Sequence, residues 1–107
     1  MKLNAYLPPK VLTDFLFNYD IDDVAYVIND DVFTLTKPKI ESSSNSEIFY
    51  IGNNGIFNVV MKQFDEIEFS SNNNVTFFNS KLGTKLIIYF HDVSSFENKL
   101  RETGYID

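Results

Sequence analysis

The chain contains one histidine and no cysteine, so few of its residues can carry acid–base or nucleophilic chemistry. His91 precedes Asp92, and a carboxylate next to a histidine can orient the imidazole as a general base. Ser94 and Ser95 place two hydroxyls nearby in the sequence. Catalysis needs several such groups in one convergent geometry, and Ser94 is better explained by a role at a helix start. We therefore predict an ordinary hydrogen-bonded histidine and no enzyme activity.

Three aspartates stand close together at Asp20, Asp22 and Asp23. Aspartates at this spacing open the EF-hand calcium loop, which then needs an acid or asparagine at its fifth position and glycine at its sixth. Val24 and Ala25 occupy those two positions. The sequence therefore does not match the EF-hand loop, and we predict no metal site here.

Two glutamates, Glu66 and Glu68, lie two residues apart and would share one face of a strand. Paired carboxylates can support glycoside hydrolysis or hold Mg²⁺. Simple alternation already explains them as a solvated outer face, with Ile67 and Phe69 pointing inward. The glycines of Gly52–Gly55 lack the lysine of a phosphate-binding loop. No cofactor is predicted.

The charge of the chain is concentrated in one quarter of its length. The net charge is −6, and residues 11–36 hold six aspartates and no lysine or arginine, whereas the remaining residues balance nine acids with nine bases. Direct binding to nucleic acid is not expected, because it requires clustered basic side chains. The six aspartates are Asp14, Asp20, Asp22, Asp23, Asp30 and Asp31.

Two interpretations of this acidic segment compete. Net charge helps to keep a small protein in solution, and the segment needs no further role than that. Alternatively, it is a docking surface for a basic protein, steered by electrostatics and anchored by aromatic side chains. Phe17, Tyr19, Tyr26 and Phe33 lie in the segment, and some of them must belong to the core. The second interpretation predicts a partner-binding site at Asp20, Asp22, Asp23, Tyr26, Asp30 and Asp31.

Small size, concentrated charge and the lack of a catalytic motif favour an inhibitor of the immunity or antitoxin type, which would neutralise a basic, nuclease-like toxin. A phage-encoded blocker of a host nucleic-acid-binding defence enzyme is the first alternative. A carboxylate-based enzyme using Glu66, Glu68 and His91, or an assembly module that pairs through sheet edges, are the others. The immunity-type function is an analogy from size and charge, and the oligomeric state stays open.

The stretch Lys85–Leu100 carries the strongest folding signal. Leu86–Phe90 is a continuous apolar run rich in β-branched and aromatic residues, which predicts a strand covered on both faces. Ser94 and Glu97 have the spacing of a capping box. They predict a helix of about 9–10 residues that ends before Gly104 at its C′ position.

The remaining elements follow from periodicity and turn residues. Apolar residues at Val11, Leu12, Phe15, Leu16 and Tyr19 form one helical stripe, so we predict a helix over residues 9–19. Hairpins are predicted for 24–28 with 32–36 and for 48–51 with 56–61. Further strands are predicted near 64–69 and 75–79, and the sequence leaves open whether 59–69 is one bent strand or two.

These elements predict an α+β fold in one globular domain, residues 1–107. The expected core is an antiparallel meander of about six or seven strands, flanked by an N-terminal and a C-terminal helix; the pattern leaves open a curl towards a half-barrel. No apolar run is long enough to span a membrane, and no signal peptide is visible at the N-terminus. Together with the lack of cysteine, this predicts a cytoplasmic protein with no membrane partner.

Overall fold

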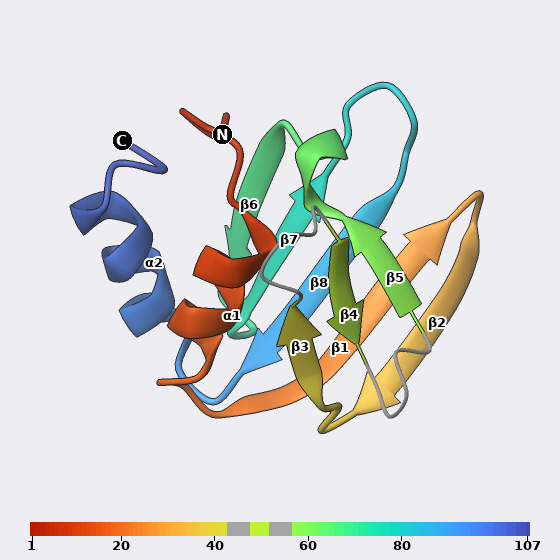
Figure 1. Cartoon of the computed structure of the whole chain (residues 1–107), viewed down its shortest axis with the longest axis horizontal. Coiled ribbons are helices and arrows are strands. Elements are labelled where there is room, and N and C mark those ends of the chain that lie inside the picture. The colour runs from red at the N-terminus through yellow and green to blue at the C-terminus, as the bar shows by residue number, and fades with distance from the viewer. Residues whose placement is uncertain (43–47, 52–56) are drawn as a thin grey trace.

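The structure is a computed structural model that describes the backbone of residues 1–42, 48–51 and 57–107, and the side chains of residues 1–39 and 58–107. Figure 1 shows the order of the elements along the chain. They are α1 (Pro9–Leu16), β1 (Ile21–Ile28), β2 (Asp31–Thr36), β3 (Ile40–Ser42), β4 (Ile48–Ile51), β5 (Phe57–Val60), the short 3₁₀ helix η1 (Met61–Gln63), β6 (Glu66–Ser70), β7 (Asn74–Phe78), β8 (Lys85–Phe90) and α2 (Val93–Glu102).

The described strands form two antiparallel sheets. The main sheet has five strands in the order β2-β1-β8-β7-β6, and the small sheet has three in the order β3-β4-β5. The α+β class, with an antiparallel sheet flanked by an N-terminal and a C-terminal helix, is confirmed. The main sheet holds fewer strands than the six or seven expected, because β3, β4 and β5 pair among themselves. It is open, with the β1–β2 hairpin added beside β8 of the β6–β7–β8 meander.

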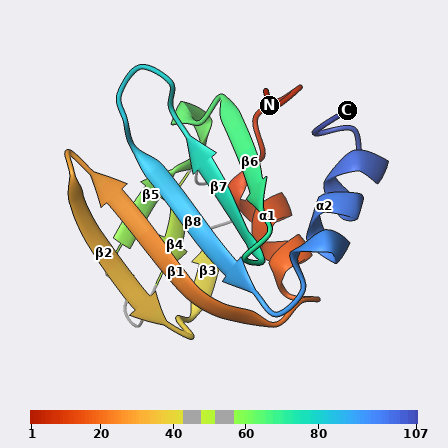
Figure 2. The ribbon, with the colours of Figure 1, turned by 180° about the vertical axis from the view of Figure 1, so that it is seen from behind.

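One face of the main sheet carries the core. Figure 1 shows α1 and the small sheet in front of that face and α2 at its β6 side, and Figure 2 looks onto the opposite face. In β8, Leu86, Ile88 and Phe90 are buried, whereas Ile87 and Tyr89 are half-buried. The prediction that this strand is covered on both faces is therefore wrong: hydrophobic residues on its outer face are shielded by neighbouring strands and not by a second layer.

Helix α1 starts with Pro9 in its first turn, as expected for a residue without a backbone N–H. It buries Leu12 and Leu16, but ends three residues before the predicted position 19. The N–H groups of Asn18 and Tyr19 donate to the carbonyls of Phe15 and Leu16, which tightens the last turn. The ring of Tyr19 then packs edge-on against Phe96 of α2, at a centroid distance of 6.1 Å.

The cap of α2 differs from the predicted capping box. Asp92 is the N-cap residue, and its Oδ1 accepts hydrogen bonds from the N–H of Ser94 at 3.1 Å and from the hydroxyl of Ser94 at 2.6 Å. Glu97 instead forms an ion pair with Arg101 at 2.6 Å. A carboxylate accepts the free N–H groups of a first turn more strongly than a hydroxyl does, which explains the choice of Asp92.

The C-terminal end of α2 is confirmed. Gly104 has a φ of +85°, and its N–H donates to the carbonyl of Arg101. The N–H of Tyr105 reaches back to the carbonyl of Leu100 at 3.0 Å. These two bonds form a Schellman motif, which satisfies the last carbonyls of the helix.

Both predicted hairpins are confirmed as strand pairs. β1 and β2 are joined by Asn29 and Asp30, whose φ angles of 49° and 71° indicate a type I′ turn. β4 pairs with β5, and the Gly-Asn-Asn-Gly turn between them lies outside the described residues. The stretch 59–69 is two strands separated by η1, and the predicted strand 75–79 begins one residue earlier. None of the described helices is long and apolar enough to cross a membrane.

Candidate protein-docking surface

The acidic segment does not form one patch. Asp20, Asp22 and Asp23 lie at the start of β1, whereas Asp30 and Asp31 lie at the hairpin turn at its far end. Across the β1–β2 ladder, Asp31 is aligned with Ile28, and Asp22 is hydrogen-bonded to Lys37. Asp22 and Asp31 are therefore six residues apart along the hairpin. At about 3.3 Å per strand residue, roughly 20 Å of backbone separates the two groups. The predicted site is therefore split into a bulge group (Asp20, Asp22, Asp23) and a hairpin group (Asp30, Asp31).

A β-bulge presents the first of these groups. Ile21 is aligned with Phe90 and Val24 with Ile88, so three steps along β1 match two along β8. The extra residue allows Ile21 and Val24 both to face the core, while Asp22 is exposed and Asp23 is half-buried between them. Bulges commonly re-aim side chains in this way.

Tyr26, which the sequence placed in the predicted site, belongs to the core. It is only 7% exposed and lies among the buried residues of the main sheet. It is aligned with Leu86 on one side and Phe33 on the other. The strand alternation that buries Val24 also buries Tyr26, because they are two residues apart. We leave Tyr26 out of the candidate surface.

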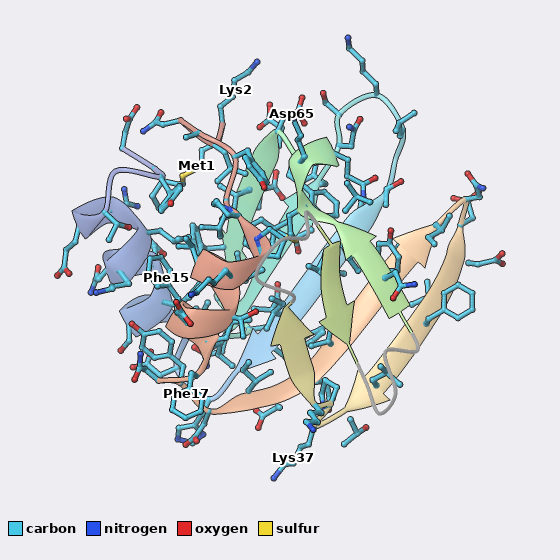
Figure 3. All side chains as sticks on the ribbon, viewed as in Figure 1. Met1, Lys2, Phe15, Phe17, Lys37 and Asp65 are labelled. Carbon is cyan, nitrogen blue, oxygen red and sulfur yellow. The ribbon has the colours of Figure 1, made fainter. Side chains whose placement is uncertain are left out.

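Phe17 was among the aromatic residues noted in the acidic segment, but it was left out of the predicted site. It is 89% exposed, more than any other large hydrophobic residue that the structure describes. Figure 3 shows it at the end of α1. The available signal was its position outside the helical stripe that runs through Leu12 and Leu16, which left it without a place in the core.

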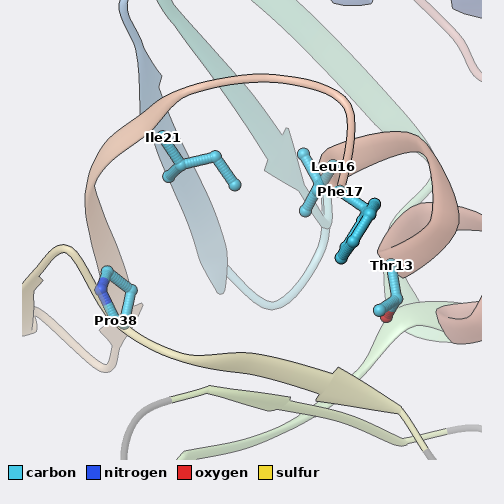
Figure 4. A pocket seen from close by; sticks show the side chains of 5 residues that line it. All are labelled: Thr13, Leu16, Phe17, Ile21 and Pro38. Atoms are coloured by element: carbon cyan, nitrogen blue, oxygen red, sulfur yellow. The ribbon is translucent and has the colours of Figure 1, made fainter.

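A shallow apolar depression lies beside Phe17. It has a volume of about 190 Å³ and is lined by Phe17 together with Thr13, Leu16, Ile21 and Pro38 (Figure 4). The lining comes from α1, from the start of β1 and from the segment after β2. The end of α1 and the nearby start of β1 therefore combine with the more distant Pro38 to build one small hollow next to an exposed ring.

Exposed carboxylates lie close in the sequence to the residues that line this hollow. Asp14 and Asp20 each lie three residues from Phe17 in the sequence, and Asp22 follows Ile21; all three are exposed. Asp14 shares a side of α1 with Phe17 because residues three apart are neighbours on a helix. We define the Phe17 surface as Phe17, the depression and the carboxylates of Asp14, Asp20 and Asp22.

The Phe17 surface is held in place from the C-terminal half of the chain. The N–H of His91 donates to the carbonyl of Asp20 at 3.1 Å, which ties the bulge group to the end of β8. Next to it, hydrogen bonds from Ser94 hold the pKa of the Asp92 carboxyl below its usual range. Asp92 thus adds a further negative charge near the bulge group at neutral pH.

The carboxylates whose side chains the structure describes do not converge as a metal site, and Glu68 does not converge with the histidine. Among the described residues, no group of three or more potential metal ligands lies close enough together to hold an ion. Glu68 aligns with Ile87 through β7, whereas His91 lies four residues further on. That is a separation of roughly 13 Å along the strands and about 10 Å across them, far beyond hydrogen-bond reach.

Comparison with known proteins adds no assignment. No protein-family model, no curated protein and no solved structure matches the chain.

Proposed function

We propose that this chain is a protein-binding inhibitor of the immunity type, which neutralises a basic, nuclease-like toxin by docking on it. The observation that carries the proposal is Phe17, which is 89% exposed beside an apolar depression, with the exposed residues Asp14 and Asp20 three positions away on either side in the sequence. The proposal gives the chain no catalytic role. It places the encounter in the cytoplasm, where a protein without cysteine is indifferent to the reducing conditions.

Burial of the exposed Phe17 ring in a partner would contribute favourably to the free energy of binding. Burying a phenylalanine side chain is worth about 1.5–3 kcal/mol, which an exposed Phe17 leaves unused in the free protein. Aromatic residues that are exposed in the free chain and enter a pocket on the partner are typical binding hot spots. The depression beside Phe17 offers the partner a matching place for one apolar side chain.

The carboxylates supply selectivity for a basic partner. An enzyme that acts on nucleic acid has a positively charged groove for phosphates, and carboxylates can occupy such a groove in their place. They also speed the encounter and make it sensitive to salt, because the charges on both sides are exposed. A blocker of a host defence enzyme would use the same chemistry, so the identity of the partner separates these two candidates.

The test starts by capturing the partner from the native host on the immobilised chain. The purified partner is then assayed for toxicity and nuclease activity with and without the chain. We expect Phe17→Ala to weaken binding by roughly 30-fold, the range of a hot-spot residue. The pair Asp20→Lys and Asp22→Lys should weaken binding and reduce its dependence on salt. Glu68→Lys and Glu102→Lys serve as matched charge controls away from the surface.

The hairpin group is tested separately with Asp30→Lys and Asp31→Lys. Loss of binding in these variants would extend the docking surface to the far end of β1. The proposal is wrong if the captured partner binds the Phe17 and bulge-group variants with unchanged affinity and unchanged salt dependence while they remain folded. It is also wrong if the captured partner is no less active in the presence of the chain.

A further inference from the structure

The two edge strands of the main sheet, β6 and β2, differ in whether another described segment pairs with their outer side. At the β6 edge, the N-terminal segment pairs with the sheet: Met1 and Ile67 exchange two backbone hydrogen bonds of 2.8 and 2.9 Å, and the N–H of Leu3 donates to Asp65. Figure 3 shows Met1, Lys2 and Asp65 together at this side. At the opposite edge lies β2, which pairs with β1 alone among the described strands.

The alternation of hydrogen-bonded pairs along the β1–β2 ladder shows which backbone groups of β2 point away from β1. A two-residue turn makes Ile28 and Asp31 a hydrogen-bonded pair, and the bond from the N–H of Lys37 to Asp22 continues the same phase. The backbone N–H and C=O groups of Val32, Thr34 and Thr36 therefore point away from β1. No hydrogen bond within the described part of the chain reaches them, and all three residues are exposed.

An outward row of backbone donors and acceptors is a template for another strand. The strand itself carries no charge between Val32 and Thr36, where charged residues would repel such pairing. Val32 is 62% exposed and Phe33 is 42% exposed, so apolar area at this edge remains open to solvent. Among the described residues, no segment pairs with this edge in the way that the N-terminal segment pairs with β6.

We propose that two copies of the chain pair through β2, antiparallel, about a twofold axis at Thr34. The charges along the segment are self-complementary in this arrangement: Asp30 and Asp31 precede the strand core, and Lys37 and Lys39 follow it. Pairing centred on Thr34 brings the start of β2 at Asp31 in one copy beside the end of β2 in the other, twice. Lys37 directly follows that end, where the backbone leaves the strand at a φ of 46°, so its ammonium lies within reach of Asp31 of the second copy and not in strict strand register with it. A twofold interface repeats each contact, so every favourable pair counts double.

In the same register, the remaining side chains of β2 lie opposite residues with which they can pack favourably. Val32 lies opposite Thr36 of the second copy, and the two Thr34 residues exchange both of their backbone hydrogen bonds. Phe33 faces Leu35 of the second copy on the core side of the sheet, where aromatic and aliphatic residues stabilise neighbouring strands. Parallel pairing of the two strands would instead bring acid next to acid and base next to base, at an energetic cost.

The pairing would also reunite the divided acidic segment. The N–H of Lys37 donates to Asp22 in its own chain, and in the proposed dimer this end of β2 lies beside Asp31 of the second copy. Asp22 and that second Asp31 are then two strand spacings apart, or about 10 Å, instead of roughly 20 Å along one chain. The hairpin group of each copy comes to lie beside the bulge group of the other. The dimer does not depend on the proposed inhibitory function.

Sedimentation velocity of the purified full chain over a wide concentration range tests the dimer. We expect a monomer–dimer equilibrium, because pairing through one short edge buries less area than a typical stable interface. Thr34→Pro removes an outward N–H without removing a bond to β1, a position where an edge strand tolerates proline. It should weaken dimerisation at least about tenfold, since both central hydrogen bonds are lost. Circular dichroism and thermal melting verify that the variant is folded.

A charge swap tests the register. Asp31→Lys and Lys37→Asp should each weaken the dimer by about tenfold, and the double variant should restore it, because the opposite charges meet again. A chain that is monomeric at every concentration overturns the proposal, as does a dimer that neither Thr34→Pro nor the single charge variants weaken. A monomer that loses a captured partner on Thr34→Pro would assign the edge to a foreign strand and equally overturn pairing of two copies.

Discussion

The backbone N–H of Lys37 donates a 2.6 Å hydrogen bond to the carbonyl oxygen of Asp22. This bond extends the β1–β2 ladder one residue beyond Thr36 and holds the segment before Pro38 against the bulge. Pro38 thereby joins the depression beside Phe17, and the outward groups of β2 keep a single phase along the strand. One backbone contact therefore shapes both the candidate docking surface and the open edge.

Two phenylalanines should differ sharply in their contribution to stability. Phe77 is fully buried, with its ring 6.2 Å from that of Phe64, so Phe77→Ala should lower the free energy of unfolding by about 3–5 kcal/mol. Phe17→Ala should change it by no more than about 0.5 kcal/mol, because the ring touches little of the protein. Urea unfolding of both variants measures the difference. A large loss for Phe17→Ala would mean that the ring stabilises the fold and is not held free for a partner.

The cap of α2 predicts a defined pH dependence. The pKa of Asp92 is lowered chiefly by the hydrogen bond from the Ser94 hydroxyl. The ionised form of this carboxyl is therefore more stable in the folded protein than in the unfolded chain. Its contribution is complete above the unfolded pKa near 3.8 and is lost as the pH falls through the lower folded value. Thermal melts should show wild type more stable than Asp92→Ala at pH 7, with the difference shrinking at acid pH. Asp92→Asn should keep a cap without this pH dependence.

The β1–β2 turn predicts a stabilising substitution. Asp30 has a φ of 71°, a region that glycine occupies without steric cost. Asp30→Gly creates the Asn-Gly sequence preferred in type I′ turns and should raise the free energy of unfolding by about 0.5–1 kcal/mol. Asp31→Gly is the control, since Asp31 is already in the strand and glycine should destabilise it. Equal effects of the two variants would contradict the turn geometry.

The end of α2 predicts a graded series at Gly104. Its φ of +85° disfavours any side chain, and an added Cβ would meet no atom within 4 Å. Gly104→Ala should therefore cost about 1–2 kcal/mol from backbone strain alone. Gly104→Asn should cost less, because asparagine tolerates this conformation better. Chemical denaturation of the three proteins tests the order, and an alanine variant as stable as wild type would refute it.

Much of the fold was predictable because its signals are local. The turn at Asn29 and Asp30, the glycine after α2 and the proline at the start of α1 act through the conformations of neighbouring residues. Strand boundaries and the cap at Asp92 were less accurate, since hydrogen-bond partners compete within a few residues. The sequence identified the aspartates of the candidate site. It did not predict that they lie in two separate groups or that Phe17 is exposed.

The sequence by itself determined the class of fold, the helices at both ends and the concentration of negative charge in residues 11–36. Only the tertiary structure decided how that charge is distributed. Once β1 pairs along its length with β8, the strand holds Asp22 and Asp31 far apart and its alternation buries Tyr26. The same pairing leaves β2 at the rim of the sheet. Such outcomes depend on contacts between segments distant in the chain, which no local pattern of residues encodes.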